Sequence, residues 1–409
     1  MEFPIVLAVL ALLVLLTGLV VALGGRRGSA RVQTRRHGEL EGRPVALHTL
    51  SNALGLTAQV SEFGATLVSV RVPDRQGVIA EVTLGHDDFR GYVEQNPYLG
   101  STIGRYANRI ADGRFTIDGR TFQVARNNHG QHLHGGVAGL DRRVWSSQPV
   151  REGNAAGVRL TYVSPAGEED YPGTLTVHVT YLVPADRNEV RLRFEATTDA
   201  PTLCNLTNHA FFNLAGGGEI LDHRLELFAD RFIPVSESLI ATGERAPVEG
   251  TPFDFRRPHT VGERIGAAHP QLVRARGYDH AYDLGLGRTT RLAARMTEPG
   301  SGRTLEVLTD APGLQFYSGN FLDGTIKARW HKPYGFRQGF CLEPGLFPDS
   351  PNQPAFHRAG YPSGVLRPGE KYAMEMVYRF GVAQENRLRL NTHLNRGWDS
   401  KECFSSVCR

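Results

Sequence analysis

The chain has 409 residues, of which 41% are hydrophobic, 9% aromatic and 22% charged. This composition is typical of a globular protein and excludes a disordered, collagen-like or coiled-coil chain. The net charge of +4 lies at the two ends, because residues 1–43 hold six arginines against three glutamates and residues 384–409 hold five basic groups against three acids. The part between them carries a net charge of −1, so we expect no nucleic-acid-binding surface there.

The chain begins with an apolar run. Residues 3–25 contain no charged side chain and one hydroxyl, Thr17. A helix of this length spans the core of a bilayer, and the run is longer than the apolar region of a secretory signal. We therefore interpret residues 1–25 as a membrane anchor, with a cleaved export signal as the alternative. The protein is then membrane-anchored or exported, and the two interpretations leave the side of the membrane open.

Two further segments lack a hydrophobic period. Residues 26–43 are rich in Arg, Gly and Ser and are predicted to form a basic linker. Residues 384–409 are predicted to be a loose tail, in which Cys403 and Cys408 are able to pair. Four cysteines in a chain of this length do not make a disulfide framework. The other two lie in apolar runs and are expected to be buried thiols: Cys204 and Cys341.

From residue 44 to residue 383 the hydrophobic period is two. Apolar residues alternate with polar ones over 171–184 and 188–197, which is typical of antiparallel strands with one buried face. Asp118-Gly119 joins two short alternating runs, as in a two-residue hairpin turn. Further strand-like runs lie at 66–72, 80–84, 304–309 and 372–380. The sequence therefore predicts an all-β fold, a large antiparallel β-sandwich forming a single domain over 44–383.

Two side chains stand out as candidates for proton transfer. His209 lies among two asparagines and two phenylalanines, which suits a proton donor, and a buried core histidine is the alternative. Glu343 ends an apolar run, where burial raises the pKa of a carboxyl and makes it a base near neutrality. An ion pair with a neighbouring arginine would instead lower that pKa.

Other polar residues stand beside aromatic or glycine-rich segments. Taken singly, each also fits a turn, an ordinary hydrogen bond or, for Arg105 and Arg109, a surface salt bridge. Together they suit a neutral polyhydroxylated ligand rather than a phosphate, which would require more positive charge. No carboxylate follows His129, His132 and His134 at ligand spacing, so we expect no metal site. The candidate binding residues are Asn108, Arg109, His134, Asp279 and Gln315.

Six ordered motifs give these residues a common context. They are GRYANRI at 104–110, LHGG at 133–136, TNHAFFNL at 207–214, YDH at 278–280, QFYSGNFLDG at 315–324 and LE at 342–343. With these motifs the sequence resembles the aldose 1-epimerase (galactose mutarotase) family over about 44–383. The resemblance implies a β-sandwich of the galactose mutarotase-like supersandwich type, with a cleft for a small-molecule aldose and no metal or organic cofactor.

The resemblance also implies roles. Glu343 matches the catalytic base and His209 the catalytic acid for interconversion of the α and β anomers of galactose or glucose. The other candidates match positions that hold sugar hydroxyls or support the acid and base. Two positions depart from the family pattern: Gly345 stands where a glutamine is common, and Phe211 where a tyrosine is frequent. Both departures leave the preferred sugar open.

Three other functions remain compatible with the residues. A glycoside hydrolase would need two carboxylates across the scissile bond, here Asp279 and Glu343. A hexose-6-phosphate epimerase would need a phosphate site. A membrane-tethered sugar-binding module would use the same cleft without turnover.

Overall fold

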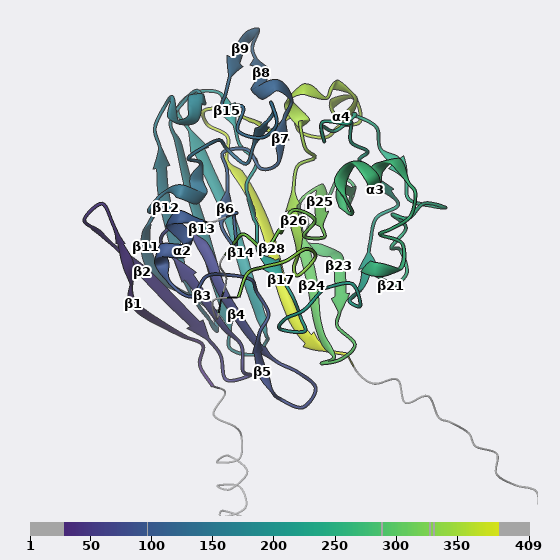
Figure 1. Cartoon of the computed structure of the whole chain (residues 1–409). Helices are drawn as coiled ribbons and strands as arrows, with labels where there is room; N and C mark the ends of the chain where they lie inside the picture. Colours follow the sequence, from purple (N-terminus) through teal and green to yellow (C-terminus); the bar gives the residue numbers. More distant parts are fainter. Residues whose placement is uncertain (1–27, 96, 288, 327–328, 330–331, 384–409) are drawn as a thin grey trace, which may run out of the picture.

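The computed structural model describes residues 28–383 apart from 96, 288, 327–328 and 330–331 (Figure 1). Three large sheets make up most of this part, and their strands pair antiparallel throughout. The predicted all-β class and antiparallel sandwich are confirmed.

The largest sheet has nine strands. In spatial order they are β11 (Ser146–Glu152), β12 (Ala155–Ser164), β13 (Leu175–Pro184), β14 (Glu189–Thr198), β28 (Tyr372–Val382), β24 (Arg303–Thr309), β23 (Arg291–Thr297), β18 (Arg224–Leu227) and β21 (His259–Thr260). Four of the runs with period two therefore form its central strands. In β13 the alternate residues Leu175, Val177 and Val179 are buried in the hydrophobic core, as the pattern predicts.

Two smaller sheets complete the sandwich. The six-stranded sheet has the order β17 (Phe211–Phe212), β26 (Phe340–Gly345), β25 (Gly313–Tyr317), β22 (Asp279–Asp283), β19 (Arg231–Phe232) and β20 (Ala246–Pro247). The five-stranded sheet runs β1 (Arg31–Leu40), β2 (Arg43–Ser51), β3 (Thr57–Ser61), β4 (Thr66–Pro73) and β5 (Ile79–Glu81). The run expected at 80–84 is thus a short strand that begins one residue earlier.

One hydrophobic core joins the three sheets. It contains Val60 and Leu67 from the five-stranded sheet, Phe194 from the nine-stranded sheet, and Phe316 and Leu342 from the six-stranded sheet. Figure 1 shows β25 and β26 beside the long strands β14 and β28. The six-stranded sheet therefore has one face on the core and one face toward the site described below.

Short pieces connect the sheets. Four two-stranded ladders pair β6 (Thr102–Ile103) with β16 (Thr207–Asn208), β7 (Arg109–Ile110) with β10 (His132–Leu133), β8 (Arg114–Ile117) with β9 (Arg120–Gln123), and β15 (Thr202–Leu203) with β27 (Val365–Leu366). The described helices are α2 (Phe89–Glu94), α3 (Pro270–Ala275) and α4 (Pro354–Arg358), beside a few 3-10 turns. Between β8 and β9, Asp118 and Gly119 have φ of 51° and 78°, which confirms the predicted hairpin turn.

The basic linker predicted for 26–43 is wrong over most of its length. Residues 31–40 form β1, which pairs with β2 from Arg31 opposite Ser51 to Leu40 opposite Arg43. Most of its side chains are exposed or half-buried, so no alternation marks it in the sequence. Its place depends on backbone hydrogen bonds to β2, which residue types do not reveal.

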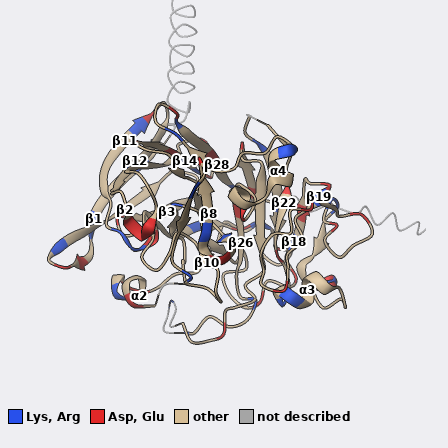
Figure 2. Cartoon of the chain, turned by 90° about the horizontal axis from the view of Figure 1, so that it is seen from above, with Lys and Arg blue, Asp and Glu red and all other residues tan. Residues whose placement is uncertain are grey.

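The predicted anchor at 1–25 and the tail at 384–409, with Cys403 and Cys408, lie outside the described residues. Among the described residues no helix is long and apolar enough to cross a membrane. Figure 2 shows that basic and acidic residues are interspersed along the chain.

Candidate active site

Six of the seven predicted site residues line one cavity of about 380 Å³. They are Asn108, Arg109, His134, His209, Asp279 and Glu343. The seventh, Gln315, lies opposite Glu343 in the ladder between β25 and β26 and is hydrogen-bonded to Asp279. A larger open groove of about 980 Å³ beside the start of β28 contains none of the seven. Residues more than two hundred positions apart in the sequence thus meet in one place.

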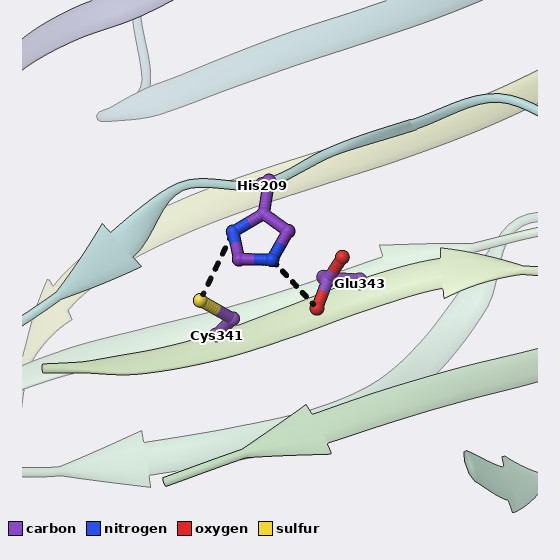
Figure 3. A group of neighbouring side chains, drawn as sticks. All are labelled: His209, Cys341 and Glu343. Carbon is purple, nitrogen blue, oxygen red and sulfur yellow. Dashed lines mark hydrogen bonds and ion pairs between the residues drawn. The ribbon is translucent and has the colours of Figure 1, made fainter. Parts of the chain in front are cut away.

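Strand β26 explains how Glu343 reaches this cavity. Successive side chains of a strand point to opposite faces. Phe340 and Leu342 are in the main hydrophobic core, while Cys341 and Glu343 lie on the other face with His209 (Figure 3). The apolar run before Glu343 therefore serves both to build the core and to place the carboxyl.

His209 has a different neighbour at each ring nitrogen. Its Nε2 lies 3.8 Å from Oε1 of Glu343, and its Nδ1 lies 3.6 Å from Sγ of Cys341 (Figure 3). Ligand atoms of these three side chains lie within 4.8 Å of one another, so the group is a candidate metal site. However, a metal binds a ring nitrogen in the plane of the imidazole, and Cys341 and Glu343 face two different nitrogens. The arrangement suits an oriented acid–base pair better than one ion.

Burial dominates the electrostatics of this pair. It raises the pKa of Glu343 well above its usual range, and the nearby charge of Asp279 adds to the shift. Burial lowers the pKa of His209 to about 4. Between these two pKa values the pair holds one proton, on the carboxyl or on the imidazole. No arginine forms an ion pair with Glu343 in the described part of the chain, so the alternative of a salt-bridged Glu343 is not observed.

Asp279 is held between two partners. The Nε2 group of Gln315 donates a hydrogen bond of 2.7 Å to its Oδ1, and Nη1 of Arg109 lies 3.8 Å from its Oδ2. Burial raises the pKa of Asp279, while Arg109 and Gln315 act to lower it. The three side chains form a polar wall with both donors and acceptors.

His134 is neutral and packs against His209. Burial lowers its pKa well below the usual value, and the neighbouring His209 and Arg109 lower it further. Its Nδ1 accepts a 3.2 Å hydrogen bond from the backbone N–H of Asn108, so the neutral ring carries its proton on Nε2. The two imidazoles meet edge to face with ring centres 5.1 Å apart.

Gly135 permits two chain segments to touch, because a side chain there (φ 89°) would place its Cβ 1.8 Å from the carbonyl oxygen of Gly104. The surface position considered for Arg105 is corrected. Arg105 is not a surface residue, being 2% exposed. Its guanidinium donates to the carbonyl oxygens of Ser164, Pro165, Pro172 and Gly173.

The aromatic rim of the cavity was not predicted from the sequence. Tyr98 packs edge-on against His134 with ring centres 4.7 Å apart, and Phe321 stacks on Tyr317. Two further rim residues, Glu237 and Arg274, form an ion pair of 3.1 Å. Tyr98 follows a short helix without any motif, whereas Phe321 belongs to a motif already identified and was a detectable signal.

Similarity to known proteins identifies the family of the chain. The aldose 1-epimerase family matches residues 46–379. The chain belongs to the aldose 1-epimerase family. Galactose mutarotase of Bos taurus is 44% identical over 330 residues, which cover 80% of this chain and 92% of that protein. Aldose 1-epimerase of Escherichia coli K12 is 39% identical over 342 residues, covering 83% of this chain and 96% of that protein.

A solved structure has the same fold. The galactose 1-epimerase from Lactobacillus acidophilus superposes with a TM-score of 0.77 at 28% sequence identity, covering 87% of this chain and all of that one. As a member of the aldose 1-epimerase family, the chain is an isomerase acting on carbohydrates. The predicted family and enzyme class are confirmed.

Proposed function

We propose that this aldose 1-epimerase family member interconverts the α and β anomers of free hexoses such as galactose and glucose, with Glu343 as base and His209 as acid. The observation that carries the proposal is the pair itself. A desolvated carboxylate and an imidazole lie 3.8 Å apart in a cavity whose other polar side chains are hydrogen-bond donors and acceptors. Galactose mutarotase and aldose 1-epimerase relatives support the same reaction.

The reaction needs two proton transfers and no net change in protonation. Glu343 takes the proton of the anomeric hydroxyl while Nε2–H of protonated His209 donates to the ring oxygen. The C–O bond of the ring breaks, its electrons pass to the ring oxygen, and the anomeric carbon becomes an aldehyde. Rotation about C1–C2 exposes the other face, and the two transfers run in reverse.

The directions of the two pKa shifts fit this cycle. Ring opening moves the shared proton from His209 to Glu343, so a protonated carboxyl and a neutral imidazole belong to the open-chain complex. Burial favours this form, since both groups are then uncharged. In the complex with the cyclic sugar, the sugar hydroxyls stabilise the ionised pair, the Glu343 carboxylate and the protonated His209.

The cavity suits an uncharged sugar better than a phosphorylated one. Its two arginines are each placed beside a carboxylate, Arg109 beside Asp279 and Arg274 beside Glu237. Neither cation is left for a phosphate group, which would be expected to need one. We propose that Arg109, Asp279, Asn108 and His134 bind sugar hydroxyls, and that Gln315 supports them by donating a hydrogen bond to Asp279.

Polarimetry of fresh α-D-galactose and α-D-glucose tests the proposal. The purified protein should accelerate the approach to the same final rotation, and the Glu343→Gln variant should not. A hexose 6-phosphate as the better substrate would point to a phosphate epimerase, and release of nitrophenol from a nitrophenyl glycoside would point to hydrolysis by Asp279 and Glu343. Saturable sugar binding without faster interconversion of the anomers would indicate a sugar-binding module without catalytic activity.

We also propose that residues 1–25 attach the enzyme to a membrane. The support is the uncharged apolar run at 3–25 followed by arginines. The full-length chain should sediment with membranes and resist alkaline carbonate, whereas a chain beginning at residue 26 should not. Extraction of the full-length chain by carbonate alone would overturn the proposal.

A further inference from the structure

A second, much smaller cavity lies behind the proposed base. Its volume is about 20 Å³, and Glu343 and Asn108 line both this cavity and the sugar-sized one. Thr207 and Gln315 also line the small cavity. A space of this size holds one water molecule, provided that it offers two to four polar partners.

Two of the atoms around this cavity have no hydrogen-bond partner. Among the described residues, Thr207 Oγ1 and Gln315 Oε1 are buried polar atoms without one. Both residues are more than nine-tenths buried, with exposed fractions of 2% and 8%. Since Nε2 of Gln315 donates to Asp279, its Oε1 is the free end of the amide. Native proteins rarely leave such atoms unsatisfied, because each costs stability comparable to a lost hydrogen bond.

The positions of the side chains explain why the space exists. Gln315 and Glu343 are direct partners in the antiparallel ladder of β25 and β26, and Gly345 follows Glu343 on the same face of β26. Gly345 has no side chain to fill the space, and a Cβ there would already lie 3.1 Å from Oδ1 of Asn205. The cavity is thus lined by polar side chains on one part of its wall, and by Gly345 and apolar residues on the rest.

We propose that one ordered water occupies this cavity and joins Thr207 and Gln315 to the carboxylate of Glu343, so that Thr207 is a positioning residue for the base. One water molecule in this place satisfies both unpartnered atoms. The hydroxyl of Thr207 donates to the water, and the two water hydrogens donate to Gln315 Oε1 and to a carboxylate oxygen of Glu343. This inference rests on the proposed role of Glu343 and adds how the carboxylate is oriented.

The water has two consequences for the base. A donor to the ionised carboxylate favours the charged form and opposes the effect of burial on the pKa of Glu343. The chain of contacts from Thr207 through the water to Gln315, Asp279 and Arg109 also ties the base to the side chains proposed to bind the sugar. Thr207 therefore influences catalysis without touching the substrate.

The test compares Thr207→Val, which keeps the shape and removes the hydroxyl, with Thr207→Ser, which keeps the hydroxyl. In the full-length protein the valine variant should lower kcat about tenfold with little change in KM, and should move the alkaline limb of the pH profile up by about one unit. The serine variant should behave as wild type. A crystal structure of the wild type at neutral pH should show a solvent peak within hydrogen-bond distance of Thr207, Gln315 and Glu343.

Two results would overturn the proposal. One is a wild-type structure without that solvent peak. The other is a valine variant with a higher melting temperature and an unchanged pH profile, as expected if the threonine hydroxyl is merely unpaired. Failure of the proposed function is a different result: Glu343→Gln would then retain activity, while the solvent peak, which does not depend on turnover, would still report on the water.

Discussion

Two buried glutamates in this molecule have opposite electrostatics. Glu189, in β14, is 1% exposed and Glu343, in β26, is 7% exposed. Burial alone would raise the pKa of both. At Glu189 it is outweighed by hydrogen bonds from Arg379 and Arg191, at 2.7 Å and 2.8 Å, and the pKa is lowered. At Glu343 the nearest partner is an imidazole at 3.8 Å and the pKa is raised.

The difference in pKa separates a structural carboxylate, Glu189, from a carboxyl suited to proton transfer, Glu343. A carboxylate with two arginines is a fixed anion that holds strands β14 and β28 together, whereas a buried carboxylate without a cation has a raised pKa and can take up and release a proton. The sequence neighbours already differ, since Glu189 lies between Arg187 and Arg191 whereas Glu343 ends an apolar run. The predictions below test whether this contrast governs activity and stability.

The largest effect is expected from Glu343→Gln. The amide has the same shape but cannot accept a proton, so kcat/KM should fall by about 10³-fold or more, within the range of a lost general base. The melting temperature should not fall, because burial already disfavours the charged carboxyl. Polarimetry and thermal unfolding of the same preparation check both points. Activity within tenfold of wild type would remove Glu343 from the mechanism.

His209→Asn should have a comparable or slightly smaller effect. The asparagine cannot carry the proton to the ring oxygen, and we expect a loss of about 10²–10³-fold in kcat. His178→Asn is the matched control, because His178 lies in β13 and is hydrogen-bonded to Thr161. Equal losses in the two variants would mean that the His209 result reflects folding rather than proton transfer.

The pH profile should report the shared proton. As the pH falls toward about 4, His209 becomes protonated while Glu343 also carries a proton. The pair then holds two protons, and Glu343 cannot accept the proton of the anomeric hydroxyl. As the pH rises above the raised pKa of Glu343, the pair loses its only proton and the acid is missing. We expect kcat/KM to be flat between the two pKa values and to fall about tenfold per pH unit beyond each of them. An acidic limb near the ordinary histidine pKa would contradict the desolvated pair.

Glu189→Gln should show the reverse of Glu343→Gln. The loss of charge-assisted hydrogen bonds from Arg191 and Arg379 should lower the free energy of unfolding by about 1–3 kcal/mol at neutral pH. Because the pKa of Glu189 is lowered in the fold, this contribution is present above the pKa of the unfolded chain and is lost as the pH falls through the folded value. Denaturant unfolding at pH 7 and at acid pH measures both, and activity should stay at the wild-type level.

The smallest effect is expected from Cys341→Ala. The thiol contacts Nδ1 of His209 at 3.6 Å and helps to orient the ring. Its removal should lower kcat by no more than about tenfold, the worth of one ordinary hydrogen bond. Polarimetry before and after treatment with a chelator adds a control. A complete loss of activity in the variant, or in the chelated wild type, would indicate a metal on His209, Cys341 and Glu343 instead of an acid–base pair.

Much of the fold follows from residue periodicity. The alternation over 171–184 and 188–197 predicts β13 and β14 because one face of each strand is buried, and Asp118-Gly119 predicts a turn because both residues tolerate positive φ. Strand β1 could not be found in this way, since neither face carries a regular apolar row.

The site could be predicted where residue type limits chemistry. Glu343 and His209 stand out because a lone carboxyl and a lone imidazole in apolar surroundings are unusual. The burial of Arg105 was not predictable, because its partners are backbone carbonyl oxygens, which leave no mark in the sequence. Thr207 was not predicted for a similar reason. Its proposed role depends only on the position of its hydroxyl beside a small cavity, which the sequence does not show.

Strand β1 has a further consequence, for self-association. It is the outermost strand of the five-stranded sheet, and an outermost strand offers free backbone groups to any other strand that approaches. Its sequence places Arg35, Arg36 and Glu39 along that border, with the guanidinium of Arg36 paired to Glu39. Charged side chains on an edge strand disfavour edge-to-edge pairing of sheets between molecules. The strand that the sequence predicts as a linker therefore disfavours aggregation of the protein.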